Sequence, residues 1–262
     1  MNYTLNVHGR LLDLSRPLVM GILNATPDSF FADSRRQTEE EIAVCCRKML
    51  AEGAAIIDVG GCSTRPGGEV ATEVQEMERL RTALAVIRRE QPEAILSIDT
   101  FRPDVARMAV EEFDADIIND VSGGTTEMFR MVTRLRVPYI LMSLQPNIRE
   151  MLLSFAEKVQ QLRDMGANDI ILDPGFGFGK TLEENYEVMN EMEKLLVMEL
   201  PLLVGISRKS MIYRSFGCTP QEALNGTTAL NTIALMKGAS ILRVHDVKEA
   251  MECVKIIEQL NG

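Results

Sequence analysis

The feature that most constrains the fold is a regular alternation of short apolar runs with longer amphipathic segments. Eight runs rich in Ile, Val and Leu span residues 18–24, 55–61, 94–100, 116–122, 137–144, 169–175, 202–208 and 241–246. Most lack the polar–apolar alternation of half-exposed strands, which is typical of parallel strands buried on both faces. The segments between them have helical spacing, as in Met77, Leu80, Leu84 and Ile87. The pattern therefore predicts repeated βα units.

Repeated βα units form either an open doubly wound sheet or a closed barrel. Eight strands, and the absence of a GxGxxG sequence after the first of them, favour the barrel. The length of 262 residues also fits, because such a barrel needs about 250 residues. We therefore predict an α/β fold, a single (β/α)8 TIM-barrel domain over residues 1–262, with its active site at the C-terminal ends of the strands. The residues before Leu18 are expected to form a short hairpin at the barrel bottom.

Charge and composition exclude several classes of partner. The net charge is −10, whereas a nucleic-acid-binding surface needs a basic face. No apolar stretch approaches the roughly 18 residues of a membrane span. The five cysteines form no CxxC pair and the first residues resemble no signal peptide, which predicts a cytoplasmic chain with reduced thiols. No His/Cys cluster has zinc spacing.

Almost every predicted strand ends in a side chain that can form hydrogen bonds. These residues are Asn24, Asp58, Asp99, Asn119, Asp120, Ser143, Asp173, Ser207, Lys209, Arg243 and His245. Any one of them could simply cap the following helix. Because the C-terminal ends of barrel strands meet at one face, the set instead predicts a polar ring around an active site.

Asp99 and Asp173 each follow an apolar run and should point into the barrel mouth. A buried carboxylate without partners is costly, and Pro174 and Gly175 offer Asp173 no side-chain donors. A ligand with adjacent N–H groups, such as an aminopyrimidinone, would satisfy the carboxylate bidentately. The alternative for Asp173 is a purely structural Asp-Pro-Gly turn.

Cationic residues form a second set that indicates an anionic substrate. They are Arg65, Arg208, Lys209, Arg243 and His245, and four of the five follow the last two strands, where this fold commonly binds phosphate. The alternative is a solvated surface cluster, which fits Arg208 better than Arg243. A metal, if used, would be a hard ion such as Mg²⁺ held mainly by substrate phosphates. The glycine-rich run 175–181 is not a Walker A sequence, and Phe176 or Phe178 is expected to be an apolar wall of the site.

Seven segments in chain order together resemble the dihydropteroate synthases, a family of pterin-binding transferases. They read MGILNATPDSF (20–30), IDVGGCSTRPG (57–67), SIDT (97–100), INDVSGG (118–124), DPGFGFGK (173–180), GISRKS (205–210) and RVHDV (243–247). The resemblance implies condensation of p-aminobenzoate with 6-hydroxymethyl-7,8-dihydropterin diphosphate in folate biosynthesis, with Mg²⁺ and with sulfonamides as competitors. It also implies a homodimer, with an apolar face on the last helices available for the contact.

The resemblance also assigns roles to residues. It implies a pterin site of Asp99, Asn119, Asp173, Lys209, Met142 and Gly205; a diphosphate site of Asn24, Arg243 and His245, with Asn24 as a Mg²⁺ ligand; and a p-aminobenzoate site of Thr64, Arg65, Pro66, Phe178, Ser210 and Phe30. Catalysis is expected from Lys209, Arg243, His245 and Asn24, which would stabilise the leaving diphosphate while the neutral aromatic amine attacks.

Several positions depart from the family pattern. Cys62 stands where the family has Glu, and Ser143 where it has His. The first loop reads FFADS (30–34) where the family commonly has FSDGG, so Ala32 stands at the family's Asp, which is absent or displaced by one to Asp33. These departures touch the loops and the rate rather than the pterin pocket. Two alternatives follow: a pterin-binding relative without turnover, or a methyltetrahydrofolate-dependent methyltransferase on the same barrel, which would not need Lys209 or His245.

Overall fold

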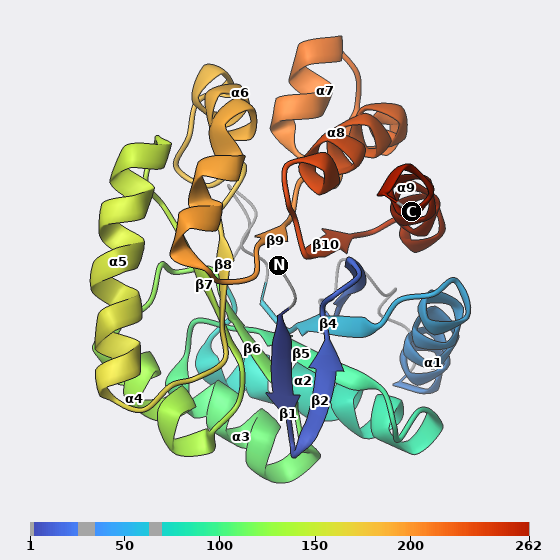
Figure 1. Ribbon diagram of the computed structural model, residues 1–262. Coiled ribbons are helices and arrows are strands. Elements are labelled where there is room, and N and C mark those ends of the chain that lie inside the picture. Colours follow the sequence, from blue (N-terminus) through green and yellow to red (C-terminus); the bar gives the residue numbers. More distant parts are fainter. Residues whose placement is uncertain (1–2, 26–34, 63–69, 262) are drawn as a thin grey trace.

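A computed structural model describes residues 3–25, 35–62 and 70–261 (Figure 1). Its main sheet consists of eight parallel strands, each overlapping one of the predicted runs. The strands are β3 (Leu18–Asn24), β4 (Ile56–Gly60), β5 (Ile95–Asp99), β6 (Ile117–Asp120), β7 (Tyr139–Met142), β8 (Ile170–Asp173), β9 (Leu203–Val204) and β10 (Ile241–Val244). The prediction for the first run, residues 18–24, is confirmed at both ends.

The strand order closes the sheet into a barrel and excludes the doubly wound alternative. Strands β3 to β8 pair in sequence order, and β10 pairs with both β3 and β9. The remaining seam is bridged where Leu172 lies opposite Leu202, and Leu172 N donates to the Pro201 carbonyl at 2.9 Å. The (β/α)8 prediction is therefore confirmed.

Helices surround this sheet on the outside, as Figure 1 shows. Within the described residues the α-helices are α1 (Arg35–Ala51), α2 (Glu73–Glu90), α3 (Pro103–Phe113), α4 (Thr126–Leu135), α5 (Ile148–Asp164), α6 (Leu182–Glu191), α7 (Ser210–Phe216), α8 (Leu224–Met236) and α9 (Val247–Asn261). The 3₁₀ helices described there are η2 (Met192–Met198) and η3 (Pro220–Glu222). Thr72 and Thr181 form capping boxes with Gln75 and Glu184, as their spacing predicts.

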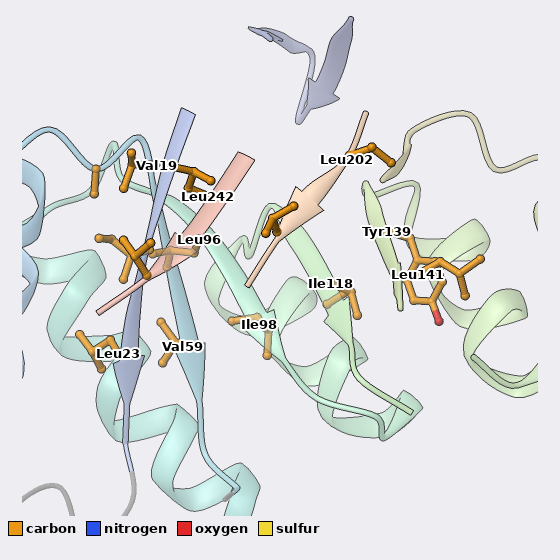
Figure 2. Close-up of a cluster of buried hydrophobic side chains, with 14 of the residues drawn as sticks. Val19, Leu23, Val59, Leu96, Ile98, Ile118, Tyr139, Leu141, Leu202 and Leu242 are labelled. Atoms are coloured by element: carbon orange, nitrogen blue, oxygen red, sulfur yellow. The ribbon is translucent and has the colours of Figure 1, made fainter. Parts of the chain in front are cut away.

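Two apolar layers hold the barrel together. Outward-facing strand residues such as Val59, Ile98 and Leu242 pack against the helices, and Figure 2 shows part of this layer. Inward-facing residues at the start of the strands, including Ile56 and Ile241, form a second cluster inside the barrel.

The predicted hairpin closes that inner cluster from below. It consists of β1 (Thr4–Val7) and β2 (Arg10–Asp13), which pair antiparallel. Leu5 and Val7 are buried in the inner cluster. The bottom of the barrel is thus filled with apolar side chains, which leaves the opposite end for chemistry.

Candidate active site

Strand alternation explains why polar residues face the axis of an apolar barrel. On β4, Ile57 and Val59 belong to the outer layer, whereas Ile56 belongs to the inner cluster. Asp58 and Gly60 lie two and four residues beyond Ile56, so they share its inward face, nearer to the C-terminal end. The same alternation turns Arg243 inward, two residues after Ile241.

Arg243 lies at the centre of an ion-pair network in the barrel mouth. Its Nε donates to Asp58 Oδ2 at 2.6 Å, and its Nη2 donates to Asp99 Oδ2 at 2.6 Å. Asn119 Nδ2 donates to the same Asp58 oxygen at 3.1 Å. Burial acts to lower the pKa of Arg243, but the two carboxylates outweigh it and raise the pKa. The guanidinium is therefore a permanent cation with a fixed orientation.

Asp58 is the member of this network to which sequence reasoning assigned no ligand role. Its side chain is fully buried and bridges Arg243 and Asn119. The signal that could have found it is its place in the inward-facing series Ile56, Asp58, Gly60. Burial raises the pKa of the neighbouring Asp99 to about 7, against the opposite effect of Arg243.

Some buried polar atoms in this layer have no protein partner within the described part of the chain. They are Asp58 Oδ1, Ser97 Oγ and Asn119 Oδ1. Ser97 pairs in register with Asp58, and Asn119 pairs with Asp99, two residues further along β5, while its Nδ2 reaches Asp58 Oδ2, so the three side chains are neighbours on the inward face. Buried polar groups are rarely left unpaired. Their lone pairs are therefore available to N–H donors of a ligand or to water.

Asp173 and Lys209 form the opposite side of the mouth. Asp173 Oδ1 accepts from the Gly175 backbone N–H at 2.8 Å, so the predicted Asp-Pro-Gly turn is present. Burial raises the pKa of Asp173, with Lys209 opposing the rise. Burial also lowers the pKa of Lys209 to about 8, although Asp173 favours its charged form.

The Lys209 ammonium is held by the glycine-rich loop after β8. Nζ donates to the Phe176 carbonyl and lies 4.3 Å from the centre of the Phe178 ring. The Phe176 side chain is fully buried, so Phe178 supplies the aromatic ring that contacts the Lys209 ammonium. This cation–π contact supports the prediction of Phe178 as a wall of the site.

Lys180 fixes the shape of that loop, a role that the sequence motif alone did not reveal. Its ammonium donates to the carbonyls of Ser143 (3.2 Å), Gly175 (3.0 Å) and Phe178 (3.2 Å). Gly175 has φ +69°, and a Cβ there would lie 2.2 Å from the Ser143 carbonyl oxygen, so only glycine fits. The loop is therefore tied to the end of β7, and Ser143 contributes to it through its backbone.

The loops after β9 and β10 are joined by two adjacent contacts. Ser207 Oγ lies 3.0 Å from His245 Nδ1. Arg208 forms a bidentate ion pair with Asp246, with distances of 2.9 and 2.6 Å. The expectation that Arg208 belongs to the anion-binding set stays a prediction, and the described partner of its guanidinium is Asp246.

Other predicted site residues lie where the fold prediction expected them. Met142 ends β7, Gly205 follows β9, and Ser210 begins α7. A Cβ on Gly60 would lie 3.8 Å from both Asn24 Oδ1 and Asp99 Oδ2, which places Asn24 beside the ion-pair network. Phe30, Ala32, Asp33, Thr64, Arg65 and Pro66 lie outside the described residues.

None of the helices in residues 3–25, 35–62 and 70–261 is long and apolar enough to cross a membrane. Within the same ranges, no three His, Cys, Asp or Glu residues are grouped so as to hold a metal ion.

Comparisons with known proteins identify the class of protein. The model of the family described as pterin binding enzyme matches residues 20–245. The chain, a barrel whose mouth presents buried acceptors beside paired cations, is therefore a pterin-binding enzyme.

Individual relatives show which family of pterin-binding enzymes the chain belongs to. Dihydropteroate synthase of Escherichia coli K12 is 38% identical over 95% of this chain and 94% of its own length. Dihydropteroate synthase of Xanthomonas albilineans, solved with 4-aminobenzoic acid, superposes with a TM-score of 0.92 at 33% identity, covering 100% and 99% of the two chains. The Yersinia pestis enzyme, solved with a sulfonamide drug complex, gives 0.89 at 36% identity, covering 99% of each chain. The chain belongs to the dihydropteroate synthase family of transferases.

Proposed function

We propose that this chain joins p-aminobenzoate to 6-hydroxymethyl-7,8-dihydropterin diphosphate, forming 7,8-dihydropteroate and pyrophosphate in folate biosynthesis. The observation that carries the proposal is the pairing of buried acceptors with cations in the mouth of a barrel of this family. Asp173 and Asn119 Oδ1 suit the N–H groups of a pterin, and Lys209 suits its carbonyl or ring nitrogens. A substrate without a flat heterocycle would not need these buried acceptors paired with cations.

Arg243 has two uses in this proposal. Its ion pairs with Asp58 and Asp99 hold the guanidinium at the level of the pterin acceptors. From there it contributes positive charge next to the developing leaving group, and His245 would add a hydrogen-bond donor. Its role as a direct diphosphate ligand stays a prediction, since both described partners of the guanidinium are carboxylates.

Mg²⁺ is the cofactor that the family implies, and the residues fit it only in part. Asn24 offers an uncharged oxygen beside Asp99, since a Cβ on Gly60 would lie 3.8 Å from an oxygen of each. Because no three His, Cys, Asp or Glu side chains of the described residues are grouped so as to hold a metal ion, most ligands would come from the diphosphate and from water, as Mg²⁺ commonly accepts. A bound Mg²⁺ would neutralise charge on the leaving diphosphate.

The reaction requires little acid–base chemistry from the protein. The bond between the pterin methylene carbon and the diphosphate oxygen breaks, and the oxygen keeps the electron pair. The amine of p-aminobenzoate forms the new C–N bond and loses one proton to solvent. Catalysis then rests on placing the two substrates in line and on cationic residues near the leaving group.

The remaining expectations are also proposals. Phe178, which contacts Lys209, and Ser210 would lie beside p-aminobenzoate. A homodimer is supported by exposed apolar side chains on α8 and α9, where Met236 is 70% and Leu260 71% exposed. All five cysteines lie in the described residues and no disulfide joins any two of them, which supports a reducing, cytoplasmic environment.

The decisive experiment mixes the purified protein with the pterin diphosphate, p-aminobenzoate and Mg²⁺. We expect dihydropteroate and pyrophosphate in equal amounts, with turnover falling when Mg²⁺ is chelated. A sulfonamide should compete with p-aminobenzoate. Tight pterin binding without either product would overturn the proposal in favour of a non-catalytic pterin-binding protein.

A further inference from the structure

Ser207 makes two contacts with the same histidine. Its Oγ accepts from the His245 backbone N–H at 3.2 Å and lies 3.0 Å from His245 Nδ1. Ser207 is only 5% exposed. The side chain is therefore enclosed at the C-terminal end of β9, against the residue that follows β10.

Hydrogen-bond accounting decides which atom of the second contact donates. A serine hydroxyl has one hydrogen and two acceptor lone pairs. The backbone N–H of His245 already uses one lone pair. If Nδ1 carried a proton, it would use the other, and the hydroxyl hydrogen would be left without an acceptor within the described residues. A buried donor left unpaired costs about 1–3 kcal/mol, so the arrangement with Ser207 donating to Nδ1 is favoured.

We propose that Ser207 is a positioning residue that holds neutral His245 in the tautomer with its proton on Nε2. The imidazole then presents an N–H donor on the edge opposite Ser207. What that donor serves rests on the proposed function: it would stabilise an oxygen of the leaving diphosphate. A donor already oriented for growing negative charge needs no rearrangement during the reaction.

The neighbouring contact makes this position rigid. Arg208 and Asp246, the next residue on each loop, form the bidentate ion pair described above. Arg208 adopts φ +56°, a conformation that costs a non-glycine residue about 1–2 kcal/mol. The Arg208 N–H also donates to Thr227 Oγ1 at 3.1 Å. Three interactions thus maintain a strained backbone whose effect is to keep Ser207 against His245.

The tautomer can be measured directly, because the chain has only two histidines. We would label histidine with ¹⁵N and record the imidazole spectrum at a pH above the ordinary histidine pKa of about 6.5. A His8→Asn variant assigns the signals, since asparagine tolerates the left-handed conformation of residue 8, where φ is +48°. We expect the proton of His245 on Nε2.

Two variants separate positioning from general structure. Ser207→Ala removes the donor and should give a mixture of His245 tautomers. In the proposed reaction kcat should fall about 10- to 100-fold, the range seen when partners that orient a functional histidine are removed, with the KM for p-aminobenzoate unchanged. Ser207→Thr keeps the hydroxyl and should restore both the tautomer and kcat.

The tautomer measurement does not depend on turnover, so it decides the inference even if the proposed reaction fails. A proton on Nδ1 in the unmodified protein would overturn it. An unchanged Nε2–H tautomer in Ser207→Ala would overturn it as well, whatever happens to kcat.

Discussion

Replacing Asp58 should weaken both the fold and the pterin site. Asp58→Ala removes a charge-assisted bond to Arg243, worth about 1.5–3 kcal/mol, and the acceptor of Asn119, worth about 0.5–1.5 kcal/mol. Arg243 keeps its bond to Asp99, so the full 3–5 kcal/mol cost of breaking a buried pair does not apply. We expect the free energy of unfolding to fall by about 2–4 kcal/mol. At roughly 2–4 °C per kcal/mol, the melting temperature should drop by about 4–16 °C.

The effect on ligand binding separates Asp58 from an ordinary buried carboxylate. Without Asp58, Arg243 and Asn119 are no longer held at the level of the ligand. We expect the Kd for the pterin diphosphate, measured by calorimetry, to rise at least about tenfold, which corresponds to 1.4 kcal/mol. Asp58→Asn, which keeps the shape, should have a smaller effect of the same sign.

A matched control is available on β6. Asp120 is also fully buried and accepts two hydrogen bonds, from Tyr139 Oη and the Ser122 N–H, both at 2.7 Å. Asp120→Asn should lower the melting temperature without changing the Kd for the pterin. If Asp58→Ala and Asp120→Asn behave alike in both measurements, the site role assigned to Asp58 is wrong.

Three further outcomes are expected. Asp173→Asn should raise the pterin Kd at least about 30-fold, because loss of a buried charged acceptor costs about 2–5 kcal/mol, with circular dichroism unchanged; retained affinity would refute its role. Pterin binding should strengthen as pH rises through about 7, where Asp99 becomes a carboxylate, and weaken above about 8, where Lys209 loses its proton; a flat profile of Kd against pH from 6 to 9 would contradict this. Arg88→Met should lower the free energy of unfolding by about 3–5 kcal/mol while leaving kcat unchanged. The reason is that Arg88 donates hydrogen bonds to four backbone carbonyls and to Asp116, away from the mouth. A loss of kcat in the folded variant would show that the two ends of the barrel are coupled.

The barrel could be predicted from sequence because its periodicity is local. Each strand lies in a short apolar run, each run is followed by helical sequence, and several helices begin at a capping residue such as Thr72 or Thr181. The residues at and just after the C-terminal ends of the strands were less predictable. The run 202–208 was expected to be extended, but the strand covers only Leu203–Val204. The chain leaves the sheet there to form the contacts of Ser207 and Arg208 with the β10 loop, and these partners lie 38 residues away.

Contacts between residues far apart in sequence also decide the roles of the charged residues. Arg208 and Arg243 look alike in sequence, since each follows an apolar run near a predicted phosphate site. The structure distinguishes them by their partners: Asp246 neutralises Arg208 at the rim, whereas Asp58 and Asp99 hold Arg243 inside the mouth. Asp58 and Arg243 are 185 positions apart. Only closure of the barrel brings them together, so no local pattern could have revealed the pair.

Asp173 shows how two competing interpretations of one residue can both hold. Its Oδ1 caps the turn at Gly175, as the structural alternative required. A carboxylate oxygen has two lone pairs, so Oδ1 can also accept a second N–H, and Oδ2 has no described hydrogen bond of its own. The turn therefore orients the carboxylate without exhausting it. An asparagine at this position would keep its oxygen on the Gly175 N–H and turn its NH₂ group toward the donors of the ligand. That reversal of hydrogen-bond polarity is the physical reason why Asp173→Asn should abolish pterin affinity while preserving the loop.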